Sequence, residues 1–348
     1  MQVANERNIR HLSLEEITDF FESMGEKKFR AKQVYEWLWQ KHAHSFADMT
    51  NLSKELRQKL GETFTLPALA VDATQYSADG TVKSRFRTHE GHLVEGVLIP
   101  TDERKTACVS SQIGCSLSCK FCATGYMDRK RNLEFDEIFD EVVLINEQSE
   151  KVYGKKLTNI VFMGMGEPLA NEPNVWAAVE RIHGDIGISA RHLTISTVGI
   201  VPGIKALTQR PLPVNLAVSL HAARDQLRTE LVPINERYPI KMLMETCREY
   251  LFTKGRRITF EWALIDAVND TDRDARELAE LCLQLTPAAH VNLIPLNPTP
   301  GSAWTASDPD DERAFVRALE EAGVPVTVRD TRGREIDGAC GQLAAATP

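Results

Sequence analysis

Three cysteines within eight residues, Cys115, Cys119 and Cys122, constrain this chain more than any other feature. Thiolates spaced this closely can converge on one centre only if the backbone between them loops around it. Iron–sulfur clusters and structural zinc are the usual occupants of such a loop. A cluster held by only three cysteines keeps one iron open, as a catalytic centre requires. The stretch therefore predicts a metal centre with an open coordination position.

Structural zinc is the alternative occupant. A closed zinc site needs a fourth Cys or His, usually from a second ligand pair. The chain has no second Cys-x-x-Cys or His-x-x-x-His pair, but Cys108, seven residues upstream of Cys115, could complete the site. In that case the protein would be a non-catalytic, zinc-stabilised RNA-binding protein.

Composition narrows the class of protein. At 348 residues and 43% hydrophobic, the chain can build one large domain and a smaller one. Its first residues lack the apolar segment of a signal peptide, so we expect a soluble, cytoplasmic protein with no membrane partner. Seven cysteines, an odd number, fit a reducing compartment. A net charge of −8 argues mildly against a nucleic-acid partner, although basic stretches occur at 129–131, 254–257 and 329–334.

The pattern of apolar residues divides the chain into three parts. Residues 1–67 are expected to form a helical accessory domain, with a capping box at Ser13–Glu16 and helix ends at Gly25 and Gly61. Residues 68–104 alternate with a period of two around two turns, which predicts a small antiparallel β connector. Residues 105–348 are expected to form the catalytic domain.

Short apolar runs alternate with helical patterns throughout this third part. The runs cover residues 107–113, 157–163, 192–197, 214–220, 258–265 and 291–296. Six strand–helix units in series predict an α/β fold with a partial (β/α)6 barrel. In such barrels the chemistry lies in loops at the carboxyl ends of the strands.

Polar residues and glycines occur at most of these strand ends. The cysteine loop follows the first run, and Gly166 and Glu167 follow the second. Ser196, Ser219, His221 and Asn297 occur at the ends of later runs. Each of these features alone is commonly a turn or a cap, but their joint placement predicts one site.

The cysteine spacing, with an aromatic residue before the last cysteine, resembles the radical S-adenosylmethionine (SAM) superfamily. Longer stretches resemble the RlmN/Cfr family of radical SAM RNA methyltransferases, and the match runs from about residue 10 to 344. The matching stretches are residues 108–122, 163–168, 219–221, 297–301 and 332–343. Thr299 and Gly338 stand where the family varies. The resemblance implies a radical SAM barrel preceded by a helical module.

The resemblance also assigns residue roles. Cys115, Cys119 and Cys122 correspond to the cluster ligands. The positions expected to contact SAM are Gly166, Glu167, Ser196, Ser219, Leu220, His221 and Asn297. Cys340 corresponds to the cysteine that is methylated, Cys108 to its resolving partner, and Glu95 to a catalytic base.

The activity that the resemblance implies is methylation of C2 of an adenine in 23S rRNA, at the peptidyl-transferase centre, and of the adenine next to the anticodon in tRNAs. Methylation of C8 by the antibiotic-resistance branch is the alternative. The implied cofactors are a [4Fe–4S] cluster and two SAM molecules per turnover, one as methyl donor and one as radical source. We also expect an electron donor such as flavodoxin, and a monomer.

These assignments agree with the chemistry of the base. C2 of adenine is not nucleophilic, so a polar methyl transfer from SAM cannot reach it. The Cys340 thiolate can instead hold the methyl group until a hydrogen atom is abstracted from it. The product would remain bound through sulfur until Cys108 attacks that sulfur, which forms a Cys108–Cys340 disulfide. Glu95 could remove the C2 proton. Cys247 and Cys282 are expected to be ordinary buried thiols.

Overall fold

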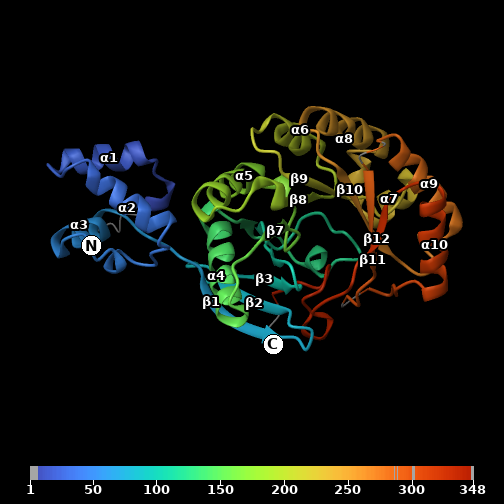
Figure 1. The fold of residues 1–348 in the computed structure, drawn as a ribbon, viewed down its shortest axis with the longest axis horizontal. Helices are drawn as coiled ribbons and strands as arrows, with labels where there is room; N and C mark the ends of the chain where they lie inside the picture. The colour runs from blue at the N-terminus through green and yellow to red at the C-terminus, as the bar shows by residue number, and fades with distance from the viewer. Residues whose placement is uncertain (1–6, 286, 288, 300–301, 346–348) are drawn as a thin grey trace.

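Ten strands, among the residues described, join into one continuous sheet (Figure 1). The computed structural model describes residues 7–285, 287, 289–299 and 302–345. The sheet order is β1-β2-β3-β4-β7-β8-β9-β10-β11-β12. The strands are β1 (Ala70–Tyr76), β2 (Val82–Arg87), β3 (Leu93–Pro100), β4 (Lys105–Cys108), β7 (Asn159–Phe162), β8 (Leu193–Thr197), β9 (Asn215–Ser219), β10 (Ile258–Leu264), β11 (Ala289–Pro295) and β12 (Val326–Val328).

Helices form the outer layer of the barrel, and three more build the N-terminal module (Figure 1). The module contains α1 (Leu14–Ser23), α2 (Phe29–Trp39) and α3 (Lys54–Thr63). The barrel helices are α4 (Phe135–Tyr153), α5 (Glu172–Arg181), α6 (Val201–Gln209), α7 (Asp225–Leu231), α8 (Ile240–Lys254), α9 (Asp272–Leu283) and α10 (Pro309–Glu321). Short helical turns are η1 (Ile9–His11), η2 (Phe46–Asp48), η3 (Ala123–Tyr126), η4 (Pro168–Ala170), η5 (Ile182–Ile186), η6 (Ala190–His192), η7 (Pro233–Glu236) and η8 (Arg334–Ile336).

Parallel pairing joins β4 to β7 and then β8, β9, β10, β11 and β12 in turn, which confirms the expected radical SAM barrel. Five of the six predicted runs coincide closely with β7, β8, β9, β10 and β11. The first run is only partly a strand, because β4 ends at Cys108. The chain then forms β5 (Gln112–Ile113), which pairs with β6 (Arg131–Asn132) in a separate two-stranded sheet.

A seventh parallel strand, β12, was not predicted. It has only three residues, and the side chains of Thr327 and Val328 are exposed. A strand this short, with so little buried apolar surface, leaves no apolar run in the sequence. It nevertheless pairs in parallel with β11 and widens the barrel beyond six strands.

The predicted β connector forms β1, β2 and β3, and both predicted turns are present. These strands are not a separate sheet, since β3 pairs antiparallel with β4 and continues the barrel sheet. The domain boundaries at residues 67/68 and 104/105 stay predictions.

The N-terminal module begins with the predicted capping box. The Glu16 amide donates to Ser13 Oγ over 3.1 Å, and the Ser13 amide donates back to the Glu16 carboxylate over 2.8 Å. Gly25, with φ of 78°, follows the end of α1 as predicted. Gly61 does not end a helix, because α3 continues to Thr63.

The module contacts the barrel through α4. The buried Arg10 guanidinium donates to Asp140 on α4 over 2.5 and 3.0 Å. Next to this ion pair, the Trp39 ring packs edge-on against Phe139, with 5.3 Å between the ring centroids. Tightly paired buried charges and aromatic packing both favour a fixed orientation of the module.

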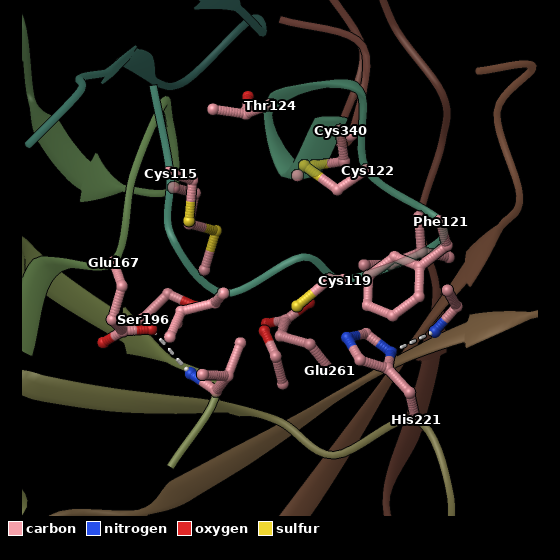
Figure 2. A pocket seen from close by; sticks show the side chains of 18 of the residues that line it. Cys115, Cys119, Phe121, Cys122, Thr124, Glu167, Ser196, His221, Glu261 and Cys340 are labelled. Atoms are coloured by element: carbon pink, nitrogen blue, oxygen red, sulfur yellow. Dashed lines mark hydrogen bonds between the residues drawn. The ribbon is translucent and has the colours of Figure 1, made fainter. Parts of the chain in front are cut away.

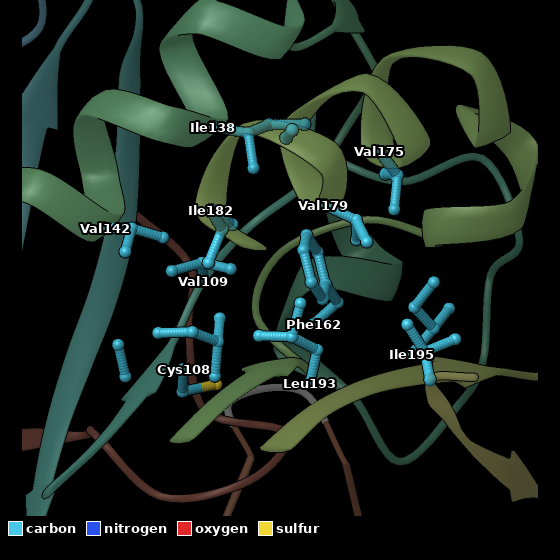
Figure 3. Close-up of a cluster of buried hydrophobic side chains, with 14 of the residues drawn as sticks. Cys108, Val109, Ile138, Val142, Phe162, Val175, Val179, Ile182, Leu193 and Ile195 are labelled. Atoms are coloured by element: carbon cyan, nitrogen blue, oxygen red, sulfur yellow. The ribbon is translucent and has the colours of Figure 1, made fainter. Parts of the chain in front are cut away.

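Between the first barrel strands and their helices lies a dense hydrophobic cluster (Figure 3). Ile138 and Val142 of α4 and Val179 of α5 approach Phe162 of β7, and these side chains are almost completely buried. Cys108 lies at the lower edge of this cluster in Figure 3. The β4 strand that carries Cys108 is therefore a rigid part of the core.

Candidate active site

A cavity of about 160 Å³ opens at the carboxyl ends of the barrel strands (Figure 2). Most of the predicted site residues line it, although they come from loops far apart in the sequence. Those residues are Cys115, Cys119, Cys122, Gly166, Glu167, Ser196, Ser219, His221, Asn297 and Cys340. Three predicted residues, Cys108, Glu95 and Leu220, do not line this cavity.

The shape of the cysteine loop depends on residues that have a positive φ or no room for a side chain. Gly114 has φ of 75°, and a Cβ there would lie 2.3 Å from the Asp128 carbonyl oxygen. A Cβ on Gly125 would lie 2.4 Å from the carbonyl oxygen of Cys119. Ser118 also has a positive φ, 52°. Glycine is the residue that can occupy such crowded positions, so the loop sequence fixes the path around the cavity.

The three thiols of the loop are protonated in the absence of a metal. Burial is the main cause, and it raises the pKa of Cys115 to about 11 and also raises the pKa values of Cys119 and Cys122. A bound cation reverses this preference, because a coordinated thiol loses its proton. Binding of a metal centre would therefore release protons from this loop.

The donor set fits a [4Fe–4S] cluster held by three cysteines. All three side chains point into one cavity (Figure 2), which continues towards the predicted SAM residues. Cys108 instead lines a neighbouring cavity together with Cys340. Within the described ranges, no three His, Cys, Asp or Glu side chains lie close enough to hold a single metal ion. Cys108 therefore does not line the cavity that the three loop cysteines share, as the four-cysteine zinc site would require.

Gly166 and Glu167 form the turn after β7. Gly166 has φ of 93°, and a Cβ there would lie 2.4 Å from Gln112 Cβ, so a larger residue would displace the turn. Glu167 is buried, and its carboxylate accepts hydrogen bonds from the amides of Leu169 (3.0 Å) and Val198 (2.9 Å). Burial raises the pKa of Glu167 to about 7. An ammonium group in the cavity would favour the charged carboxylate.

His221 lies on the opposite wall of the cavity (Figure 2). The amide of Ala263 donates to its Nδ1 over 2.9 Å, and burial lowers the pKa of the ring to about 3. The neutral ring therefore carries its proton on Nε2, which leaves one donor for a ligand. The Phe121 ring packs edge-on against it at 4.3 Å.

Asn297 has one hydrogen-bonding atom that the described residues do not use. Its amide nitrogen donates to the Cys340 carbonyl over 3.0 Å, whereas its Oδ1 is buried and has no partner among the residues described. A buried acceptor facing a cavity is costly to leave unpaired, so it is suited to a ligand with a donor. Together with the Gly166–Glu167 turn, this atom fits the expected binding of SAM.

Leu220 is the exception among the predicted SAM residues. Its side chain is completely buried and does not line the cavity. Its backbone amide donates to the Glu261 carbonyl over 3.0 Å. Pro300 and Gly301, at the end of the predicted 297–301 stretch, lie outside the described residues.

Arg228 of α7 contacts the loops that follow β8 and β9. The side chain is completely buried, and burial lowers its pKa to about 10. It donates to the carbonyls of Val198, Ser219 (3.2 Å) and Leu220 (3.1 Å) and to Asn235 Oδ1 (2.8 Å). These contacts tie the loops after β8 and β9 together, so that Ser219 and His221 are held at the cavity.

We expect Arg228→Met to lower the free energy of unfolding by about 3 kcal/mol or more, because several buried carbonyls lose their donor at once. Chemical denaturation measures this change. Arg224→Met is the matched control, since Arg224 is partly exposed and its ion pairs with Asp274 and Glu277 should contribute roughly 1 kcal/mol or less. Equal losses for the two variants would contradict the organising role of Arg228.

Cys340 lies where two cavities meet. It lines the cavity of the cysteine loop and also a second one of about 110 Å³, which Cys108 lines. The Arg329 guanidinium lies 3.4 Å from Cys340 Sγ and 3.7 Å from the Glu261 carboxylate. Arg329 thus places a positive charge beside this sulfur. Burial raises the pKa of Cys108 to about 12.

Glu95 is the predicted site residue that the structure places farthest from expectation. The side chain is buried on β3, and it lines neither of the two cavities that Cys340 lines. Its carboxylate contacts Lys83 and the backbone of Ala344 and Ala345. The role of Glu95 as a base stays a prediction.

The sequence analysis missed Arg228, Glu261 and Arg329. Arg329 was counted only with the basic stretch 329–334, because the short strand before it was not predicted. Residues that follow a barrel strand lie at the active-site face, so prediction of β12 would have pointed to Arg329. Glu261 lies within a predicted apolar run. An acidic residue inside such a run is visible in the sequence alone and would have pointed to this position.

Known proteins match this chain over almost all of its length. The family model of the "Ribosomal RNA large subunit methyltransferase N-terminal domain" matches residues 7–66, and that of the radical SAM superfamily matches residues 109–282. A relative from Cytophaga hutchinsonii, named "Probable dual-specificity RNA methyltransferase RlmN", is 48% identical and covers 97% of this chain and 92% of its own. The relative of the same name from Thermobifida fusca is also 48% identical, over 97% of this chain and 95% of its own.

A solved structure agrees with these matches. The crystal structure of a radical SAM methyltransferase from Sphaerobacter thermophilus has a TM-score of 0.91 and 42% sequence identity, and the match covers 98% of this chain and 100% of that one. Membership of the superfamily implies a [4Fe–4S] cluster and SAM as cofactors, which the cavity fits. By sequence, by fold and by the residues of its cavity, the chain belongs to the RlmN family of radical SAM methyltransferases.

Proposed function

We propose that the protein methylates C2 of an adenine in 23S rRNA, at the peptidyl-transferase centre, and C2 of the adenine next to the anticodon in tRNAs. The observation that carries this proposal is the position of Cys340 between the cavity of the cysteine loop and the cavity of Cys108. A methyl carrier has to reach both a radical source and a resolving thiol, and Cys340 faces both.

The cofactors and the protein divide the chemistry between them. When bound, the cluster and two SAM molecules supply the methyl group, the reducing electron and the hydrogen-atom abstraction. Cys115, Cys119 and Cys122 would hold the cluster, and Glu167 and Asn297 would orient SAM. The protein itself contributes the Cys340 sulfur, which carries the methyl group, and Arg329, whose guanidinium lies beside that sulfur.

Release of the product requires the second thiol. The Cys108 thiolate attacks the Cys340 sulfur, so that an S–S bond forms while the bond between sulfur and the RNA-bound carbon breaks. The electron pair of the broken bond stays with the carbon, which takes up a proton and becomes the methyl group. An external thiol must reduce the disulfide before the next cycle.

RNA can reach these thiols only with a base that is unstacked from its neighbours. Cys340 is only partly exposed and lines two cavities, so a base stacked within RNA could not contact it. Proteins commonly recognise RNA at unstacked bases, and here the unstacked base would be the target adenine. The C2 product, rather than C8, is favoured by the relatives' names, because dual specificity for rRNA and tRNA is expected for the C2 branch.

The basic stretches differ in their availability for phosphates. Arg129 and Lys130 are exposed and can contact RNA. Arg131 is already paired with Glu137 over 2.6 and 2.8 Å and with Glu90 over 2.7 Å. The stretch 254–257 precedes β10 and therefore lies at the amino ends of the strands, away from the cavity. Phosphate contacts near the site thus depend on Arg129 and Lys130 more than on the other basic residues of these two stretches.

The other partners rest on the sequence alone. A flavodoxin-like electron donor, the monomeric state and the cytoplasmic location stay predictions. No helix within the described ranges is both long and apolar enough to cross a membrane.

Deletion of the gene tests the proposed activity. We expect 2-methyladenosine to disappear from 23S rRNA and from a subset of tRNAs, as measured by mass spectrometry of nuclease digests. The wild-type gene should restore the methyl groups, and the Cys340→Ala gene should not. Loss of a methyl group at C8, or no change at all, would contradict the C2 assignment.

A further inference from the structure

The carboxylate of Glu95 binds the backbone of residues 344–345 in the C-terminal segment. Its Oε2 accepts hydrogen bonds from two consecutive backbone amides, those of Ala344 (3.1 Å) and Ala345 (3.0 Å). Its Oε1 lies 3.4 Å from the Lys83 ammonium. Glu95 is only 2% exposed, so these contacts satisfy a charge that water does not reach. Both oxygens are therefore engaged in this state of the protein.

The register of the sheet explains why Glu95 meets this segment. Val97 pairs with Cys108 on β4 and with Lys83 on β2, and directly paired residues share a face of the sheet. Glu95 lies two residues before Val97 on β3 and so shares that face. The sheet thus places Lys83, Glu95 and Cys108 on the surface over which the C-terminal segment runs.

The segment after Cys340 has further fixed points, among them the buried Leu343 side chain and the Gln342 amide nitrogen, which donates to the Pro298 carbonyl over 3.1 Å. The Ala123 amide donates to the Gly341 carbonyl over 2.7 Å, and Thr124 Oγ1 donates to the Leu343 carbonyl over 2.6 Å. Beyond Leu343, among the residues described, the Ala344 and Ala345 amides donate to Glu95, and Ala345 also packs against the hydrophobic core. Ala345 has φ of 50°, a conformation in which successive amides converge on one anion. Hydrogen bonds to a buried charge are stronger than those to a neutral acceptor.

We propose that Glu95 is a positioning residue, which fastens the segment 343–345 and thereby keeps Cys340 between the two cavities while the methyl group is loaded. The inference rests on the proposed role of Cys340 as methyl carrier. It gives Glu95 two roles, fastening of the segment and removal of a proton, which the carboxylate cannot perform at the same time. The carboxylate can remove a proton from the base only after the segment has left it, so release of the tail precedes the proton transfer.

Hydrogen exchange measures the fastening directly. Glu95→Ala should speed exchange of the Ala344 and Ala345 amides by roughly tenfold to a hundredfold, because they lose a charged acceptor. Glu95→Gln keeps an acceptor oxygen and should retain most of the protection. The experiment follows the C-terminal peptide of the full chain by mass spectrometry. If Glu95 acted only as a base, all three proteins would exchange alike.

Glu335→Ala is the matched control. Glu335 is an exposed carboxylate that precedes Cys340 in the C-terminal part of the chain, and it accepts a hydrogen bond from the Ala78 amide over 2.5 Å. Its removal should leave exchange at Ala344 and Ala345 unchanged. A loss of protection equal to that of Glu95→Ala would show that any weakening of the segment has this effect, and would overturn the assignment.

Loading of Cys340 provides the functional measurement. With SAM and a reductant but no RNA, methylation of Cys340 should be slow in Glu95→Ala and close to wild type in Glu95→Gln. A residue that acts only as a base would leave loading normal in both variants. Failure of the wild-type protein to methylate Cys340 would count against the proposed function, whereas the exchange result would stand.

A double variant tests the proposal even where Glu95→Ala alone fails to fold. Glu95→Ala leaves the Lys83 ammonium buried without a partner, which is itself destabilising. The double variant Lys83→Met/Glu95→Ala removes this charge and should show the same fast exchange at Ala344 and Ala345. Wild-type protection in a folded double variant would contradict the proposal.

Discussion

Cys108→Ala protein purified from growing cells should carry covalently attached RNA, and Cys340→Ala protein should carry none. The two thiols act at different steps. Without Cys108, Cys340 still accepts the methyl group and still joins the base, but nothing attacks the sulfur to release the product. Without Cys340, the methyl group has no carrier. A ribonuclease-sensitive shift of the protein on a denaturing gel measures the adduct.

The placement of the two cysteines supports this asymmetry. Cys340 lines both cavities, whereas Cys108 lines only the second one, which Cys122 of the loop also lines. The matched controls are Cys247→Ala and Cys282→Ala, which remove buried cysteines of α8 and α9 and should give no adduct. A double variant that lacks both Cys108 and Cys340 should also be free of RNA. A folded, cluster-containing Cys108→Ala protein without bound RNA would contradict the mechanism.

Cys119→Ala should lose the cluster, from roughly four irons per chain to almost none. Two cysteines cannot replace the third ligand, because the remaining thiols of the loop already bind other irons. Iron and sulfide analysis of anaerobically purified protein measures this loss, together with the brown absorbance. Zinc in a stoichiometric amount in the wild-type protein, without iron, would contradict the cluster assignment.

The effect on the fold should be smaller than the effect on iron. Cys119 is buried in a small apolar cluster that includes Leu231, Val232 and Leu296, so part of the loop belongs to the packed interior. Loss of one sulfur atom there leaves only a small cavity. Cys247→Ala, at a completely buried position, is the stability control and should keep its iron. Full iron content in Cys119→Ala would remove Cys119 from the ligand set.

Local features of the sequence predicted much of this protein. The spacing of Cys115, Cys119 and Cys122 requires a loop around a centre, and the long apolar runs correspond to strands because buried parallel strands need apolar residues on both faces. The Ser13–Glu16 capping box and the Gly25 turn likewise depend on neighbouring residues alone. Such features involve few contacts across the chain, so they can be read without the fold.

Tertiary structure decided which distant residues meet. Arg228 and Arg329 look like ordinary surface cations in the sequence, but the fold buries the first beneath the strand-end loops and places the second against Cys340. Glu95 looked like a residue of the catalytic cavity, and the register of β3 instead places its carboxylate under the C-terminal segment. The spacing of three cysteines is a property of one loop. The partner of a buried charge depends on strand register and chain path, which only the folded chain defines.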